Sequence, residues 1–199
     1  MNAARATARM AELVPAKKRP VPPQAGFTLM EMLVVLAIII ALAGVLIPAA
    51  IRQMDRGKET QVRMDMQGLE EAIKAFYAEY GRYPGGSMGG DISLRFNNSA
   101  ALNELRGLPT ATINTRRIQF FEGRLARGNP PKGGLNTSGD LLDPWGSVYM
   151  VFIDGNADGD VNTAYFGTVR SHQVAMVSLG PNGKRDAAGS SGFDDIYSW

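Results

Sequence analysis

The sequence predicts an α+β protein in which one long N-terminal helix packs on a small antiparallel sheet of three strands. Three observations predict this class: an uncharged apolar run at Met32–Ile51, an amphipathic repeat at Val62–Tyr80, and strand-like runs confined to the C-terminal third. Helical patterns come first and strand patterns follow, so the two kinds of element are segregated rather than alternating. Segregation of this kind is typical of α+β proteins.

The apolar run from Met32 to Ile51 holds 20 residues without a charge. At ~1.5 Å per residue such a helix spans about 30 Å, the thickness of a bilayer core. A buried core helix is the alternative, but a domain of ~150 residues rarely buries so long a helix on all sides. Residues 1–26 carry five basic side chains and one acidic one. This charge predicts a single membrane pass with a cytoplasmic N-terminus and an exported C-terminal body.

Two residues of this segment do not suit a plain membrane helix. Glu31 borders the run, and a carboxylate near hydrocarbon costs about 2–3 kcal/mol, so a cationic partner is expected. Nothing in residues 32–51 supplies that cation. The alternative is that Glu31 lies among the lipid headgroups. Pro48 lies inside the far end of the run and predicts a bend where the helix leaves the bilayer.

The stretch Gly26-Phe27-Thr28-Leu29-Met30-Glu31, between a basic leader and an apolar helix, resembles the processing site of type IV pilin-like precursors. The resemblance implies that a peptidase removes residues 1–26 as a leader peptide and methylates the new amine of Phe27. It also implies that Glu31 neutralises the N-terminal amine of a neighbouring subunit, and that Pro48 is the proline common in this helix. Residues 27–54 would then form the transmembrane and assembly half of the helix, and residues 55–199 the exported body.

Beyond Arg52 the helical pattern becomes amphipathic. Its apolar stripe recurs every three or four positions, at Val62, Met66, Leu69, Ile73, Phe76 and Tyr80. Such a stripe predicts a helix that covers a sheet, and the seam of a coiled coil is the alternative. Gly81 and the run Tyr83-Pro84-Gly85-Gly86 predict the end of the helix.

The body after the helix contains short elements joined by loops. We expect a short helix at Ser99–Arg106, an extended piece at Arg116–Phe121 and a surface loop at Gly123–Gly139. The three predicted strands are Ser147–Ile153, Val174–Leu179 and Asp195–Trp199, which are β-branched and aromatic runs of strand length.

The order of the turn Asp143-Pro144-Trp145-Gly146, two strands, a glycine-rich loop and a final strand resembles the major (G-type) pseudopilin of type II secretion systems. In that family the segment between the last two strands binds calcium. By position the resemblance implies calcium ligands at Leu179, Asn182, Asp194 and Asp195, with a further main-chain oxygen near Lys184. Asn182 replaces a more usual aspartate, which weakens the expected site, and Lys184, Arg185 and Asp186 complicate it. Caps of turns are the alternative role for Asp194 and Asp195.

A second, weaker metal candidate is the cluster Asp154, Asn156, Asp158 and Asp160, which matches the first half of an EF-hand loop. Position 12 of that loop falls on Tyr165, where a glutamate is expected. A hairpin turn built from Asn, Asp and Gly is therefore the favoured alternative.

The sequence offers no catalytic constellation. His172 is the single histidine and cysteine is absent, which excludes histidine-based triads, Cys–His pairs and multi-histidine zinc sites. The excess of basic charge lies in residues 1–26, so no nucleic-acid footprint is expected on the body.

The resemblance therefore implies a structural, non-enzymatic pseudopilin of the inner membrane. Its expected partners are prepilin peptidase, an inner-membrane assembly platform, membrane lipid, and copies of itself and of other pseudopilins. Together they would build a periplasmic filament for type II protein secretion. One alternative is a type IV pilin for adhesion, motility or DNA uptake, although such pilins often carry a C-terminal disulfide that this cysteine-free chain lacks. Another is a signal-anchored periplasmic calcium-binding domain.

Overall fold

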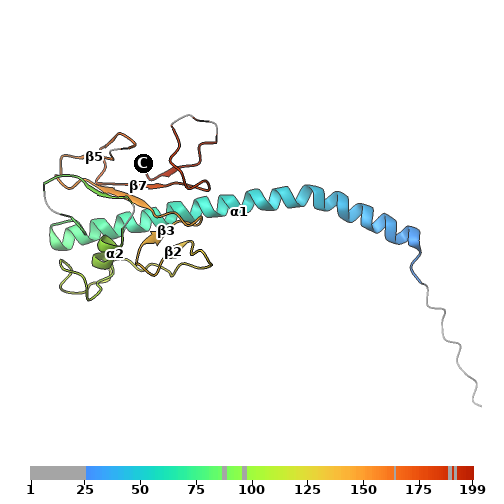
Figure 1. Ribbon diagram of the computed structural model, residues 1–199, viewed down its shortest axis with the longest axis horizontal. Coiled ribbons are helices and arrows are strands. Elements are labelled where there is room, and N and C mark those ends of the chain that lie inside the picture. The colour runs from blue at the N-terminus through green and yellow to red at the C-terminus, as the bar shows by residue number, and fades with distance from the viewer. Residues whose placement is uncertain (1–25, 87–88, 96–97, 164, 188–189, 191) are drawn as a thin grey trace, which may run out of the picture. The chain divides into compact units, whose positions relative to one another are not determined.

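The computed structural model describes residues 26–86, 89–95, 98–163, 165–187, 190 and 192–199, so the leader up to residue 25 lies outside the described residues. The chain divides into two compact units, one ending at Ile47 and the other running from Pro48 to Trp199. The elements, shown in Figure 1, are α1 (Leu29–Tyr80), β1 (Ile92–Leu94), α2 (Ser99–Leu105), β2 (Gly134–Leu135), β3 (Leu141–Leu142), β4 (Met150–Ile153), β5 (Asp160–Asn162), β6 (Thr168–Arg170), β7 (Val174–Ser178) and β8 (Ile196–Tyr197).

Helix α1 joins the two predicted helical patterns into one element of 52 residues. It passes through Pro48, where the missing N–H removes one backbone hydrogen bond, and the boundary between the two units falls at this residue. The helix ends as predicted at Gly81, whose N–H donates to the Tyr77 carbonyl at 2.8 Å. Gly81 has φ 65°, a left-handed conformation that glycine adopts without the steric cost of a side chain.

The main sheet has four antiparallel strands in the order β1-β4-β7-β8, rather than the predicted three. The predicted strands correspond to β4, β7 and β8, and the sequence analysis missed β1. That strand has three residues and pairs Ile92 with Ile153, so it is too short for a periodic signal. Two ribbons, β2–β3 and β5–β6, were also missed for this reason. The extended piece predicted at Arg116–Phe121 forms no strand in the described chain.

Both faces of the sheet are buried. The stripe of α1 packs on one face, where the buried residues are Val62, Met66, Leu69, Ile73, Phe76, Val151, Ile153, Val174 and Met176. The β5–β6 ribbon covers the other face, with Val161 and Val169 against Met150, Phe152, Ala175 and Val177. This confirms that the stripe covers a sheet. It also explains why β4 is apolar at every position, and β7 at every position except the buried Ser178, instead of alternating.

The first half of α1 has the opposite character. From Leu29 to Ile51 its apolar side chains are exposed, for example Ile40 at 71% and Val45 at 73%. By length and composition α1 is the one helix in the described chain that is apolar enough to cross a membrane. Its mean hydropathy over the best window is 3.0, with none of that window buried.

Candidate functional site

The N-terminus of α1 is closed by a reciprocal pair of side-chain hydrogen bonds. The Glu31 N–H donates to Thr28 Oγ1 at 3.2 Å, and the Thr28 N–H donates to Glu31 Oε2 at 3.4 Å. This is a capping box, in which two otherwise unpaired backbone donors are satisfied by the side chains of an S/T-x-x-E sequence. The carboxylate also lies at the positive end of the helix dipole. The sequence analysis missed this role, although the spacing of Thr28 and Glu31 contains the signal.

The residues around the predicted cleavage site are accessible. Phe27 is 74% exposed, and a Cβ added to Gly26 would meet no atom within 4 Å. The local fold therefore does not itself require a glycine at this position.

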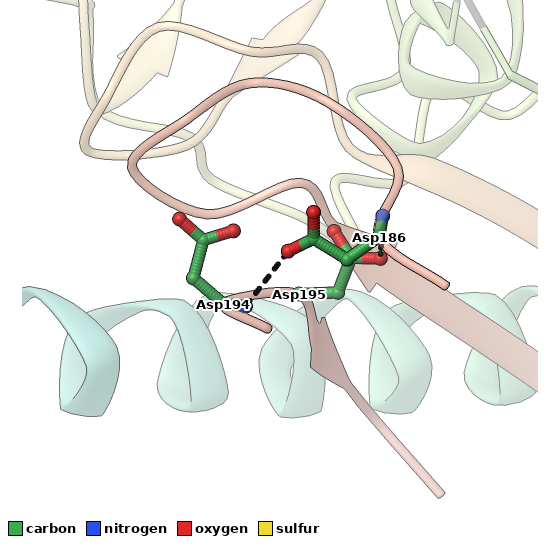
Figure 2. A group of neighbouring side chains, drawn as sticks. All are labelled: Asp186, Asp194 and Asp195. Atoms are coloured by element: carbon green, nitrogen blue, oxygen red, sulfur yellow. Dashed lines mark hydrogen bonds between the residues drawn. The ribbon is translucent and has the colours of Figure 1, made fainter. Parts of the chain in front are cut away.

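Three carboxylates converge in the loop between β7 and β8. Asp186, Asp194 and Asp195 each place an oxygen within 4.8 Å of the others, and Figure 2 shows the three side chains gathered beneath the loop. The Asp186 N–H donates to Asp195 Oδ2 at 3.0 Å, and the Asp194 N–H donates to Asp186 Oδ2 at 2.9 Å. Asp194 Oδ1 and Asp195 Oδ1 are buried and accept no hydrogen bond from the described residues.

The backbone of the loop holds these groups together. Gly180 lies so close to Asp194 that an added Cβ would come within 2.2 Å of the Asp194 carbonyl oxygen. The Tyr197 hydroxyl donates to Asp195 Oδ2 at 3.3 Å from strand β8. The two ends of the loop are thus fixed against each other before any cation is considered.

The electrostatics of the three carboxyl groups differ. Burial raises the pKa of Asp194, and the hydrogen bond and charge of the nearby Asp186 side chain add to this rise. Burial likewise raises the pKa of Asp195. The N–H of Asp194 lowers the pKa of Asp186, with help from the Asn182 side chain. Two carboxyl groups of the cluster therefore carry their charge at a cost that a bound cation would offset.

The structure places the predicted ligands unequally. It brings Asp194 and Asp195 together as expected, but the third carboxylate is Asp186, which the sequence analysis had treated as a complication. Asn182 supports the cluster from outside, because its Nδ2 donates to both oxygens of Asp186 at 3.2 Å. Its Oδ1 accepts the Lys184 N–H at 2.6 Å. Ligation by Leu179 and Asn182 stays a prediction.

The second acidic cluster forms a turn. Asp154 is buried, and its two oxygens accept the N–H groups of Asp158 at 3.2 Å and Gly159 at 2.9 Å. The Asp160 N–H donates to Asp158 Oδ1, and the Asn156 amide donates to Asp158 Oδ2. These bonds form a turn of Asn, Asp and Gly residues, as in the alternative interpretation. The turn is not a hairpin, because it joins β4 to β5, and these strands pair with β7 and β6 instead of with each other. Among the residues that the structure describes, only the Asp186, Asp194 and Asp195 group has three converging acidic ligands.

Comparisons with known proteins give one motif match and several relatives that cover most of the chain. Residues 22–47 match the prokaryotic N-terminal methylation motif. The type II secretion system core protein G of Klebsiella pneumoniae is 27% identical over 176 residues, which is 88% of this chain and 94% of that protein. The core protein G of Pseudomonas aeruginosa is 26% identical over 88% of this chain and 95% of its own length. No solved structure matches the chain significantly.

A type IV pilin matches a much smaller part. The type IV major pilin protein PilA of Myxococcus xanthus is 39% identical over 62 residues, which is 31% of this chain and 28% of that protein. Core protein G relatives instead match the helix and the body together. With the methylation motif at the start of α1, this match makes the chain similar to the G-type pseudopilins among the type IV pilin-like proteins.

Proposed function

We propose that the protein is a structural subunit of the periplasmic filament of a type II secretion system, and not an enzyme. The observation that carries the proposal is the apolar first half of α1, which begins at a methylation motif and stays exposed among the residues that the structure describes. Such a surface needs lipid or other copies of the same helix to cover it. The body is the exported part, on the periplasmic side of the inner membrane.

Maturation would convert the start of α1 into an assembly site. Prepilin peptidase cuts after Gly26 and methylates the amine of Phe27, which then lies four residues before Glu31. In the precursor Glu31 bonds to the Thr28 N–H. During assembly on the inner-membrane platform, the amine of a neighbouring subunit pairs with this carboxylate in a medium of low dielectric constant, where the attraction is strong. Pro48 lets the helix adjust where it leaves the bilayer.

A type IV pilin is the second candidate, favoured by the identity of the Myxococcus xanthus pilin over 62 residues. The two candidates share processing and helix packing and differ in the machine that builds the filament. Deleting this gene separates them, because a pseudopilin is required for protein secretion and a pilin for surface pili.

Calcium is the cofactor that we propose for the loop between β7 and β8. Oxygens bound to one calcium ion at about 2.3–2.6 Å lie up to about 5 Å apart. One carboxylate oxygen from each of Asp186, Asp194 and Asp195 lies within 4.8 Å of the others, and two buried oxygens of the cluster accept no hydrogen bond from the described residues. The residues therefore fit the ion, which would neutralise the cluster and tie the loop to β8.

The test of the proposed function is the variant Gly26→Val, with Gly57→Ala as its matched control. An added Cβ meets no atom within 4 Å at either glycine, so neither change disturbs the fold. We expect intact-mass measurement to show loss of residues 1–26 and gain of one methyl group in the native chain and the control. The Gly26→Val chain should keep its leader and build no filament. Normal processing of Gly26→Val would refute the assignment of the cleavage site.

A further inference from the structure

A basic arm extends from the body at residues 124–132. It opens with Arg124, Leu125 and Arg127, turns through residues 128–131, and returns at Lys132. The whole stretch from Gly123 to Gly139 contains three basic residues and no acidic one. The sequence predicts a surface loop here, with a contact between subunits as the alternative to a solvated connector.

The two basic residues at the tip face each other across the arm. The Arg127 N–H donates to the Lys132 carbonyl at 3.0 Å, and the Lys132 N–H donates to the Arg127 carbonyl at 2.9 Å. They are thus a directly opposed antiparallel pair. Like charges in such a pair destabilise it, and both side chains are exposed. An anionic partner would convert this repulsion into binding.

The arm also presents an apolar side chain. Leu125 is 72% exposed and lies two residues before Arg127 in extended chain, so the two share a face. A surface that combines basic residues with an exposed leucine matches a membrane interface, where phosphate groups adjoin hydrocarbon.

Contacts within the second unit fix the level of the arm along α1. Arg124 pairs with Asp65 at 3.0 Å, and a Cβ on Gly133 would lie 3.3 Å from the Gln61 side chain. A Cβ on Gly146 would lie 3.4 Å from Lys132, and the neighbouring Trp145 ring lies 6.0 Å from Lys58 Nζ. The arm therefore lies beside the first covered turns of α1, close to the end of the apolar run at Ile51.

The arm lies against α1 at Gln61, ten residues beyond Ile51, or about 15 Å along the helix. The headgroup layer occupies about 5–8 Å beyond the hydrocarbon core. The remaining gap of about 7–10 Å is comparable to the Debye length of ~8 Å at physiological salt. Arg127 and Lys132 are consequently within electrostatic reach of lipid phosphates.

The helix itself contributes charges at this level. Arg52 and Arg56 are exposed. Asp55 pairs with Lys58 at 3.6 Å. Glu59 is then the one acidic residue of this stretch that forms no ion pair with the described residues. Basic charge therefore exceeds acidic charge at the membrane-proximal end of the body.

We infer that the basic arm binds the anionic phospholipid headgroups of the membrane surface from which the body projects. The inference rests on the membrane placement in the proposed function and adds a lipid partner for the body. While the subunit waits in the membrane, the contact holds the body down on the bilayer. Assembly into a filament must then break this contact.

The chain has no cysteine, so one label can be introduced at a chosen position. We would place an environment-sensitive fluorophore on Leu125→Cys in the full chain, held as single copies in nanodiscs. A water-soluble quencher reports exposure of the label. We expect protection in nanodiscs of phosphatidylglycerol and none in nanodiscs of phosphatidylcholine. A label on Thr110→Cys, exposed beside α2, is the positional control.

Charge removal completes the test. Arg127→Gln with Lys132→Gln should abolish the protection, as should 1 M salt, where the Debye length falls to about 3 Å. The control Arg82→Gln with Arg117→Gln removes the same charge from exposed positions outside the arm and should change nothing. Equal protection in both lipids would overturn the inference. So would protection that appears only with two copies per nanodisc, which would assign the arm to a subunit contact instead. Neither outcome depends on cleavage or filament formation.

Discussion

The two halves of α1 differ in whether their apolar side chains are exposed or buried. From Leu29 to Ile51 no side chain is buried within the chain, whereas six are buried between Val62 and Phe76. The second half is stabilised by its own sheet, and the first requires lipid or other subunits. One helix thus combines a folding element with an assembly element, and the same substitution should have different effects in each.

The largest expected effect is that of Phe76→Ala. This ring is fully buried and packs against Tyr80 at 4.8 Å and Phe120 at 5.4 Å between ring centroids. Removing it from a packed core should lower the free energy of unfolding of the body by about 3–5 kcal/mol. Thermal unfolding followed by near-ultraviolet circular dichroism, on the full chain in detergent, measures this loss.

Ile39→Ala is the matched change in the first half, where the side chain is 54% exposed. It should leave the unfolding temperature of the body unchanged and weaken assembly alone. A comparable drop in both variants would show that the two halves do not differ as described.

Removal of calcium should have the next largest effect on the stability of the body. If the ion is present at one hundred times its dissociation constant, chelation should cost the body about 2.7 kcal/mol. Asp194→Asn should abolish this sensitivity to a chelator, since Asp194 Oδ1 is one of the two buried oxygens of the cluster that accept no hydrogen bond from the described residues. Asp158→Asn, in the turn between β4 and β5, should keep it. Calorimetry with and without a chelator provides the measurement, and an unchanged unfolding temperature would exclude a structural calcium ion.

Glu104→Gln should destabilise the body by about 1–3 kcal/mol, the usual cost of leaving buried donors unpaired. The Glu104 carboxylate is buried and accepts the N–H groups of Thr112, Ile113 and Asn114 and the hydroxyl of Thr112. Burial raises the pKa of Glu104, but these hydrogen bonds outweigh it and hold the pKa below its ordinary value.

The direction of the pH dependence follows from this lowered pKa. The carboxylate contributes its full stability above the ordinary pKa of a glutamate, and the contribution is lost as the pH falls through the folded-state pKa. Urea unfolding between neutral and acidic pH should therefore show a steeper loss for the native chain than for Glu104→Gln. Parallel curves would contradict the role of this carboxylate.

The sequence predicted those parts of the molecule that carry a local pattern. The stripe from Val62 to Phe76, the C-terminal glycine of α1 and the strands β4 and β7 all have clear periodicity or composition. Strand β1 was missed because its three residues gain their order from pairing with β4, in which the partner of Ile92 is Ile153, 61 positions further along the chain. Tertiary pairing of this kind leaves no signal in a short segment.

The candidate site likewise contains residues with a local sequence signal and one residue whose role depends on tertiary structure. Asp194 and Asp195 were found by their position before the last strand, but Asp186 was not, since its role depends on how the loop folds back. Its carboxylate meets the N–H of Asp194 only in the closed loop. Conversely, the Thr28–Glu31 capping box has a purely local signal in the spacing of its two residues, but the prediction for Glu31 used only the charge of its side chain.

The smallest expected effect concerns that capping box. Thr28→Ala removes one of its two bonds and should cost the start of α1 about 1 kcal/mol. In the precursor, hydrogen exchange at the amides of residues 29–33 should speed up several-fold, while exchange in the body stays the same. Thr60→Ala is the control, because its hydroxyl donates to the Arg56 carbonyl inside the helix and closes no terminus. If the two variants exchange alike, the Thr28–Glu31 pair does not stabilise the helix end, and Glu31 is free to meet an amine without first breaking a cap.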